Sequence, residues 1–281
     1  MSYETPLLRR KIQRLKGKIT PIYYELVYAL FTPRHVSCMN YGYAPVSPGV
    51  ARYYPCPEES LQYELYWQTY SQLDRPLSED QVLCEISSGR GGGLSFLSRM
   101  IKGRVIGLER SVFARLHSRH RFNLDVRHAA APLLPLPDQS VDVFISIEAA
   151  HNYHTSKFVS EMFRCLKPGG FVLLTDTYNG TDQYVRDILK RRYDQAGFSI
   201  ESWRDIRTNV IEAMHQDEAR KGAFLGRLPF FLRDEGSAFL GMVGSHKYLE
   251  MKYDKRAYFI MKARKLEKAL QRGQPPCYIS S

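Results

Sequence analysis

The chain has 281 residues, a length that suits one large α/β domain with appendages or two small domains. Apolar residues make up 44% and charged residues 25% of the sequence, as is ordinary for a soluble globular protein. The formal charge of +11 is concentrated near the two ends. Because no recognisable reader motif with interleaved aromatic residues accompanies this charge, we expect no nucleic-acid partner.

Targeting segments and metal sites are not indicated either. No apolar run approaches the length that crosses a bilayer, and residues 1–18 lack the apolar core and cleavage site of a secretory signal. We therefore expect a cytoplasmic protein. The five cysteines are widely spaced and none forms a Cys-x-x-Cys pair, so neither a disulfide framework nor a metal site is predicted.

The first part of the chain predicts a helical and aromatic cap over residues 1–75. Residues 6–31 have apolar positions at helical spacing with basic residues between them, which fits a helix on the protein's own core or on a membrane surface. Residues 23–57 are rich in tyrosine and interrupted by Pro and Gly, so no long regular element is expected there. Residues 57–73 predict a helix that begins with proline and two glutamates.

From residue 81 onward, short apolar strands alternate with helices. Strands are predicted at 82–86, 104–108, 124–126, 141–147, 171–175 and 257–261, and helices at 94–100, 111–120 and 156–166. The strand at 141–147 is almost purely apolar, as expected when helices cover both faces of a sheet. Alternation of this kind produces right-handed βαβ units, so the predicted fold is a doubly wound α/β sheet.

A glycine-rich turn follows the first strand, at residues 85–93 (EISSGRGGG). Glycine permits a tight turn and a close approach of a ligand to the backbone, and the N–H groups at the start of the next helix face that ligand. Glu109 ends the next strand about 20 residues further on, where a carboxylate can accept both hydroxyls of a ribose. NAD and S-adenosylmethionine (SAM) both fit this geometry.

The order of the later features distinguishes the two cofactors. Four segments carry the distinction: E-x-x-x-G-x-G at 85–91, LPLPD at 134–138, SVDV at 140–143 and LKPGG at 166–170. Together they resemble class I SAM-dependent methyltransferases over roughly residues 81–176. The resemblance implies a Rossmann-like, mostly parallel sheet of seven strands, with SAM as the cofactor.

The resemblance also assigns cofactor contacts residue by residue. The candidates are Glu85, Ser87, Gly89, Gly91, Glu109, Ala131 and Glu148. Glu85 is implied to orient the amino group of SAM, Gly89 and Gly91 to pass beneath its methionine part, and Glu109 to hold its ribose. Many relatives have an acidic residue at 130 or 131 that bonds the adenine. Both positions are alanine here, so we expect backbone groups and apolar contact to hold the adenine.

Candidate catalytic residues follow the fourth strand, in the segment 147–154 (IEAAHNYH). Ligands of such sheets bind beyond the carboxyl ends of the strands, so this segment should face the transferred methyl group. His151 is the candidate general base because its ordinary pKa lies near physiological pH. Glu148 would orient His151 or act as a base itself. O-methylation needs a base for the hydroxyl proton, whereas C-methylation of an alkene needs a shielded and then deprotonated carbocation.

Four segments narrow the resemblance: MNYGY at 39–43, the turn at 85–93, EAAHNY at 148–153 and LPFFL at 228–232. They resemble the mycobacterial phthiotriol and phenolphthiotriol dimycocerosate methyltransferases, which O-methylate a very hydrophobic lipid alcohol. The N-terminal tyrosines are also similar to those of sterol and prenyl C-methyltransferases, in which aromatic rings would stabilise a cation. The candidate substrate contacts are Tyr24, Tyr41, Tyr43, Tyr153 and Phe230.

The last third of the chain predicts a lid. Residues 205–250 insert Phe-, Leu- and Met-rich helical pieces into a methyltransferase domain spanning 76–265, and a tail follows at 266–281. These pieces fit a lid over an apolar pocket or ordinary helix packing.

We expect methylation of a hydroxyl on a hydrophobic, lipid-like or polyketide-like small molecule. The alternatives are methylation of an alkene carbon of an isoprenoid, such as a prenyl diphosphate or a sterol, and a SAM-binding partner protein without catalysis. Two further questions stay open: whether the basic N-terminal helix touches a membrane peripherally, and whether the chain forms a homodimer.

Overall fold

The computed structural model describes residues 25, 32–129, 132–153 and 155–267. Most of the predicted N-terminal helix and of the predicted C-terminal tail lies outside these residues, as do the candidate site residues Tyr24 and Ala131. Within the part of the chain that is described, no helix combines the length and the apolar character that crossing a bilayer requires.

In the described part of the chain, seven strands form a single sheet in the order β3-β2-β1-β4-β5-β7-β6. They are β1 (Val82–Ile86), β2 (Arg104–Glu109), β3 (Val126–His128), β4 (Val141–Ile147), β5 (Leu166–Asn179), β6 (Phe198–Asp205) and β7 (Arg256–Lys265). Strands β1 to β5 are parallel to their neighbours in the sheet, and β7 is antiparallel to both β5 and β6. The predicted Rossmann-like, mostly parallel sheet is therefore confirmed, with one antiparallel hairpin at its edge.

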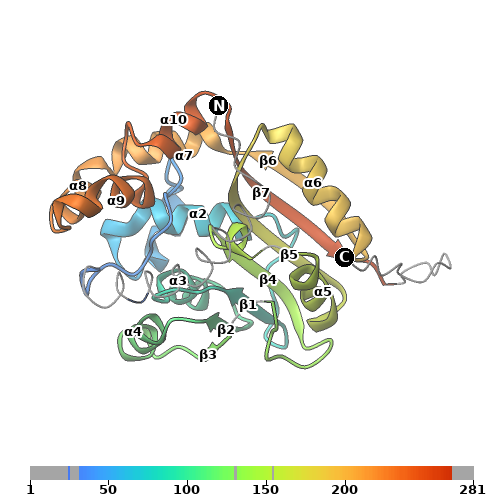
Figure 1. Ribbon diagram of the computed structural model, residues 1–281. Helices are drawn as coiled ribbons and strands as arrows, with labels where there is room; N and C mark the ends of the chain where they lie inside the picture. The colour runs from blue at the N-terminus through green and yellow to red at the C-terminus, as the bar shows by residue number, and fades with distance from the viewer. Residues whose placement is uncertain (1–24, 26–31, 130–131, 154, 268–281) are drawn as a thin grey trace.

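Helices cover both faces of the sheet (Figure 1). They are α2 (Ser60–Tyr70), α3 (Gly92–Met100), α4 (Val112–Phe122), α5 (Ser156–Cys165) and α6 (Asp182–Gln195). Alternate residues of each strand point to opposite faces of the sheet, so the side chains of neighbouring positions pack into two separate hydrophobic cores. Leu83 and Val143 pack with α2 and α3, whereas Cys84 and Phe144 pack with α5 and α6.

The tyrosine-rich segment before α2 packs into the first of these cores. Its described residues include the short 3-10 turns η2 (Pro48–Tyr53) and η3 (Pro57–Glu59). Tyr41 and Tyr43 are buried in the same cluster as Leu83 and Ile145 of the central strands. This packing brings the segment against the sheet near the carboxyl ends of β1 and β4, beside the cavity described below.

Helices fill the connection between β6 and β7, as the sequence predicts for residues 205–250. They are α7 (Arg207–Gln216), α8 (Glu218–Leu225), η5 (Phe230–Leu232), α9 (Arg233–Leu240) and α10 (His246–Lys252). Val210 of α7 and Tyr248 of α10 join the first core, whereas α8 and α9 lie further from the sheet, at the left of Figure 1. The inner pair therefore anchors the insertion and the outer pair extends it.

Several element boundaries differ from the prediction, and the starts of β5 and β3 have a clear structural cause. Strand β5 begins at Leu166, directly after α5, so the LKPGG segment belongs to the strand rather than to a separate turn. Leu166 pairs with Val141 and Phe171 pairs with Val143, and the register shift between them accommodates the extra residues. Strand β3 begins at Val126 and not at residue 124, because Asn123 ends α4 in a left-handed conformation before the chain turns into the sheet.

Candidate functional site

A cavity of about 900 Å³ opens beyond the carboxyl ends of β1, β2 and β4. This is the position at which doubly wound sheets bind their ligands. Its wall includes Ser87 and Gly89 after β1, Glu109 at the end of β2, Glu148, His151 and Tyr153 after β4, Met39 and Tyr41 of the N-terminal segment, Phe239 of α9 and Lys247 of α10. The cavity thus collects most of the predicted site residues into one place.

The glycine-rich turn owes part of its composition to packing inside the protein. Gly91 has a φ of +84° and precedes α3, a backbone conformation that glycine adopts without strain. A Cβ on Gly93 would overlap the ring of Tyr66 from α2. Glycine at position 93 therefore lets α2 lie close to α3, and the hydroxyl of Tyr66 then donates a 2.6 Å hydrogen bond to Oε1 of Glu85.

Glu85 is buried at the end of β1, and only one of its carboxylate oxygens is paired. Oε2 has no hydrogen-bond partner among the described residues. Burial raises the pKa of Glu85 to about 7, against the opposing effect of the Tyr66 hydrogen bond. A buried carboxylate oxygen without a donor is costly, and an ammonium group would supply the missing donor. The site therefore fits the amino group of SAM, although Glu85 lies behind the cavity wall and its neighbours Ser87 and Tyr66 form that wall.

Glu109 lies on the cavity wall and is held by backbone N–H groups. Gly89 donates to Oε2 over 2.8 Å, and Ser111 donates to Oε1 over 2.7 Å. Burial raises the pKa of Glu109, and these hydrogen bonds oppose the increase. Each carboxylate oxygen keeps a second acceptor site, so the fixed carboxylate remains able to bind the hydroxyls of a ribose.

Ser87 and Tyr153, two candidates 66 positions apart in the chain, come together in the structure. Their hydroxyl oxygens lie 2.8 Å apart at the cavity wall. The ring of Tyr153 packs edge-on against Phe158 of α5, which fixes its orientation. The pair therefore links the turn after β1 to the segment after β4.

His151 is oriented by Asp176 of β5. The imidazole Nδ1 lies 2.7 Å from Oδ1 of Asp176, and the backbone N–H of His151 donates to Oδ2 over 2.7 Å. Asp176 is fully buried and also accepts from the backbone N–H of Thr177, so its position is tightly determined. A carboxylate at Nδ1 places the ring proton there and leaves Nε2 as the proton acceptor. Nε2 has no hydrogen-bond partner within the described residues.

Glu148 takes part in a separate cluster. Its φ of +51° turns the side chain toward the N-terminal segment, where Oε1 accepts from the backbone N–H of Tyr41 over 2.6 Å and from the hydroxyl of Tyr258. Burial raises the pKa of Glu148 to about 7, and these two hydrogen bonds oppose the increase. The expectation that Glu148 orients His151 is corrected, because Asp176 occupies that position.

Two of the candidate substrate contacts do not reach the cavity. Tyr43 is buried in the first core, with the guanidinium of Arg204 5.8 Å from its ring centroid. Phe230 lies on η5 at the outer part of the insertion and is 82% exposed. By contrast, Tyr41 lies on the wall, and its hydroxyl donates to the carbonyl of Ala238 in α9 over 2.8 Å. Tyr41 therefore ties the insertion to the site.

Four residues at or beside the site were not predicted from the sequence, namely Tyr66, Asp176, Lys247 and Tyr258. A signal existed for Asp176, which is an acidic residue near the carboxyl end of an apolar strand, where ligands of this fold bind. The two tyrosines resemble ordinary core residues in the sequence. Lys247 lies on the cavity wall, and burial lowers its pKa, but one lysine in a basic C-terminal region carries no distinguishing pattern.

Comparison with known proteins identifies the family. The methyltransferase domain family matches residues 84–174. The phthiotriol/phenolphthiotriol dimycocerosates methyltransferase of Mycobacterium tuberculosis is 33% identical over 196 residues, which cover 66% of this chain and 70% of that protein. The fatty-acid O-methyltransferase of Mycolicibacterium smegmatis is 29% identical over 232 residues, covering 79% of this chain and 82% of the relative.

A solved structure supports the fold assignment. The geranyl diphosphate C-methyltransferase of Streptomyces coelicolor A3(2), determined with Mg²⁺, geranyl diphosphate and S-adenosyl-L-homocysteine, aligns with a TM-score of 0.62 at 16% identity. The alignment covers 89% of this chain and 98% of that one. The cofactor is SAM, in agreement with the position of Glu109 and with the Glu85 oxygen that has no partner among the described residues. The chain belongs to the SAM-dependent methyltransferase family that includes the phthiotriol/phenolphthiotriol dimycocerosates methyltransferases.

Proposed function

We propose that this methyltransferase acts on a hydroxyl of a hydrophobic, lipid-like or polyketide-like small molecule. The observation that carries the proposal is the pair formed by His151 and Asp176, joined over 2.7 Å, with His151 on the cavity wall. The names of the relatives, which refer to dimycocerosates and to fatty acids, support a lipid acceptor with an oxygen nucleophile. Apolar wall residues such as Met39, Ile147 and Phe239 favour an apolar body next to that oxygen.

We assign the cofactor contacts as follows. Glu85 binds the amino group through its partnerless oxygen, and Glu109 binds the ribose hydroxyls. Ala129 and Leu134 supply apolar surface for the adenine, and the neighbouring positions 130 and 131 are also alanine. Bound SAM supplies an electrophilic methyl group on its sulfonium sulfur.

The chain's own part in the reaction is to position the acceptor and remove its proton. The acceptor hydroxyl donates to Nε2 of His151, which takes the proton as the oxygen becomes nucleophilic. Asp176 stabilises the imidazolium that forms, because its buried carboxylate already bonds Nδ1. The apolar wall and the helical insertion keep water away from the reacting oxygen.

A second candidate is methylation of an alkene carbon of an isoprenoid. The observation that favours it is Glu148, a carboxylate at the cavity wall that accepts from the backbone N–H of Tyr41 and from the hydroxyl of Tyr258, with Tyr41 on the same wall. Aromatic rings stabilise a nearby cation, and a carboxylate with a pKa of about 7 can accept the proton that a carbocation loses. In this mechanism Glu148 is the essential base and His151 is not.

The experiment that tests the proposal is a methyl-transfer assay with isotopically labelled SAM. The purified chain is incubated separately with a long-chain lipid alcohol, a fatty acid and geranyl diphosphate, and the products are analysed by mass spectrometry. Label in the ether of the lipid alcohol supports the proposal. Label in a fatty-acid methyl ester means that the acceptor oxygen belongs to a carboxylate. Label on a carbon of the geranyl chain overturns the proposal in favour of the alternative.

Two variants separate the mechanisms. His151→Ala should lower turnover of the alcohol by about 10²- to 10⁴-fold, the range of general-base catalysis, while SAM affinity measured by calorimetry stays the same. Glu148→Gln should retain most of the turnover. If His151→Ala keeps its activity and Glu148→Gln loses it, the carbon-methylation mechanism holds instead. If neither wild type nor variants transfer methyl groups although SAM binds, the chain acts as a SAM-binding partner protein.

A further inference from the structure

Helix α4 exposes a stripe of large apolar side chains next to the cavity. Val112 and Phe113 are each 49% exposed and Leu116 is 45% exposed. Residues 112 and 116 are one turn apart on the helix, and 113 lies beside them, so the three form one patch. The opposite face of α4 is buried through Ala114 and Ser118 against β2 and β3. The exposed stripe therefore lies on the solvent-facing side of α4, opposite the side that packs on the sheet.

The surroundings of this stripe are strongly basic. Residues 110–124 contain four arginines and two histidines, and no aspartate or glutamate. Among the described residues, no salt bridge joins any of these arginines to a carboxylate. The acidic groups next to this segment have other partners. Glu109 accepts from the N–H groups of Gly89 and Ser111, and Asp125 pairs with Arg104 and Arg127. Glu25 accepts from the N–H of Val112 and the hydroxyl of Ser111 at the start of the helix. Positive charge therefore surrounds the apolar patch and remains available to an external anion.

The position of α4 connects the patch to the site. Arg110 and Ser111, immediately before the helix, line the cavity. Leu134 also lines it, and its neighbour Leu133 is 72% exposed. In Figure 1, α4 lies at the lower edge of the molecule, away from the insertion that carries α8 and α9. The cavity therefore opens beside the patch.

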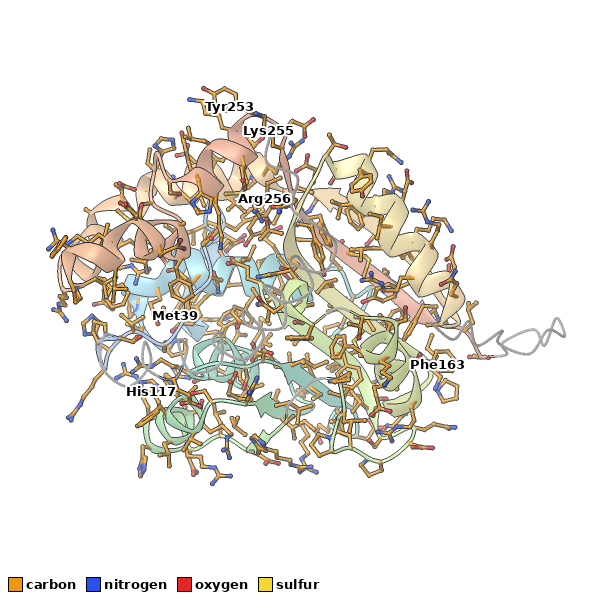
Figure 2. The ribbon with its side chains drawn as sticks, viewed as in Figure 1. Met39, His117, Phe163, Tyr253, Lys255 and Arg256 are labelled. Carbon is orange, nitrogen blue, oxygen red and sulfur yellow. The ribbon has the colours of Figure 1, made fainter. Side chains whose placement is uncertain are left out.

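Helix α4 is held firmly on its inner side. The Nδ1 atom of His117 lies 2.9 Å from the carbonyl oxygen of Arg90 and its Nε2 atom lies 3.0 Å from that of Arg34, so the neutral ring donates to one of the two carbonyls. Figure 2 shows His117 on the side of α4 that faces the body of the protein. The outer stripe is thus presented by a fixed helix.

We propose that the outer face of α4 docks on an anionic lipid surface, with Val112, Phe113 and Leu116 entering the interface. Amphipathic helices that lie on membranes combine apolar side chains on one face with flanking arginines or lysines that attract anionic lipids. A nucleic acid would match the charge but leave the three apolar side chains without a partner. This inference rests on the proposed function, in which the acceptor is apolar. That acceptor then reaches the cavity from the lipid surface, beside Arg110 and Ser111.

The test is sedimentation of the full chain with vesicles of phosphatidylcholine alone and of phosphatidylcholine mixed with phosphatidylglycerol. Wild type should bind the mixed vesicles, and added salt should weaken the binding because salt screens exposed charges. The double variant Phe113→Ser/Leu116→Ser and the charge variant Arg119→Glu should each need about tenfold more lipid, or still more, for half-binding. Circular dichroism and cofactor binding confirm that the variants are folded.

A matched control lies on α6, on the far side of the molecule from α4 (Figure 1). The variant Tyr184→Ser/Arg191→Glu removes one exposed aromatic and one exposed cation there, and it should bind vesicles as wild type does. The inference is overturned if wild type ignores anionic vesicles or if the α4 and α6 variants lose binding equally. It is also overturned if the α4 variant changes only the oligomeric state, which makes the patch a protein interface. Methyl transfer to a detergent-dispersed acceptor should persist in the α4 variant, so failure of docking is distinguishable from failure of the proposed function.

Discussion

The two sides of the cavity hold their carboxylates in different ways. On the cofactor side, Glu109 is fixed by backbone N–H groups of Gly89 and Ser111, all within one βαβ unit. On the acceptor side, the imidazole of His151 is oriented by the carboxylate of Asp176 from the next strand. Glu148 combines the backbone N–H of Tyr41 with the hydroxyl of Tyr258 from β7, 110 positions away. Backbone donors survive substitution of their side chains, whereas a side-chain partner disappears with a single replacement. We therefore expect the acceptor side to be the more sensitive of the two.

Asp176→Asn should produce the largest effect. An asparagine can present its NH₂ group to Nδ1, which moves the ring proton to Nε2 and removes the proton acceptor. Turnover of the acceptor should fall by about 10²-fold or more, as expected when general-base catalysis is lost. SAM affinity should remain at the wild-type value. An equal loss of turnover and of SAM affinity would indicate a structural role for Asp176. It would also contradict the separation between the cofactor side and the acceptor side of the cavity.

Glu85→Gln should act on the cofactor side alone. Removal of the buried charge removes a hydrogen bond between ionised groups, which contributes about 1.5–3 kcal/mol, or roughly a 10- to 100-fold increase in the Kd for SAM. Turnover at saturating SAM should change by less than about threefold, because the variant leaves His151 and Asp176 untouched. Calorimetry and steady-state kinetics separate the two quantities. An unchanged Kd would show that Glu85 supports Tyr66 rather than the cofactor.

The stability of the cofactor-free protein should fall as the pH rises. Burial raises the pKa values of Glu85 and Glu148 from 4.5 to about 7, so the folded state binds more protons than the unfolded state between these values. The stability that the two groups contribute is complete below about pH 4.5 and is lost as the pH rises through about 7. Between about pH 6 and 8 the loss should be roughly 1 kcal/mol for Glu85, and less for Glu148, whose partly exposed side chain is screened by solvent.

Thermal unfolding at several pH values measures this loss. Glu85→Gln should flatten the pH dependence relative to wild type, since glutamine has no proton to exchange. Bound SAM should stabilise the protein more at pH 8 than at pH 6, because its amino group pairs with the ionised Glu85. A pH dependence that is identical in wild type and Glu85→Gln would contradict the raised pKa.

Phe230→Ala should have the smallest effect, although the LPFFL segment forms part of the family resemblance. Phe230 is exposed and does not line the cavity, so KM and turnover should stay within about twofold of wild type. Tyr41→Phe is the matched comparison within the same group of candidates. It removes the hydrogen bond to Ala238 that ties α9 to the site, and KM for the acceptor should rise. A larger effect of Phe230→Ala than of Tyr41→Phe on KM or turnover would mean that the outer part of the insertion contacts the acceptor, contrary to the position of Phe230 outside the cavity.

The elements that carry a clear local pattern were predictable from the sequence. Strands β1 and β4 occupy the predicted positions, because a strand covered on both faces is a short apolar run bounded by turns. Strand β6 was not predicted. It is an edge strand with most residues only half-buried, so its sequence lacks both the apolar run and a regular alternation. The start of β5 was misplaced because proline and glycine in LKPGG indicate a turn, whereas the sheet accommodates them at an irregular register.

The sequence by itself determined the glycine-rich turn and Glu109, since both depend on residues within one βαβ unit and on backbone geometry. Only the tertiary structure decided which partner each catalytic candidate has. Asp176 and Tyr258 reach His151 and Glu148 because β5 and β7 are neighbours in the sheet, and β7 returns antiparallel after the helical insertion. Strand order and direction arise from packing of the whole chain, and no local pattern encodes them.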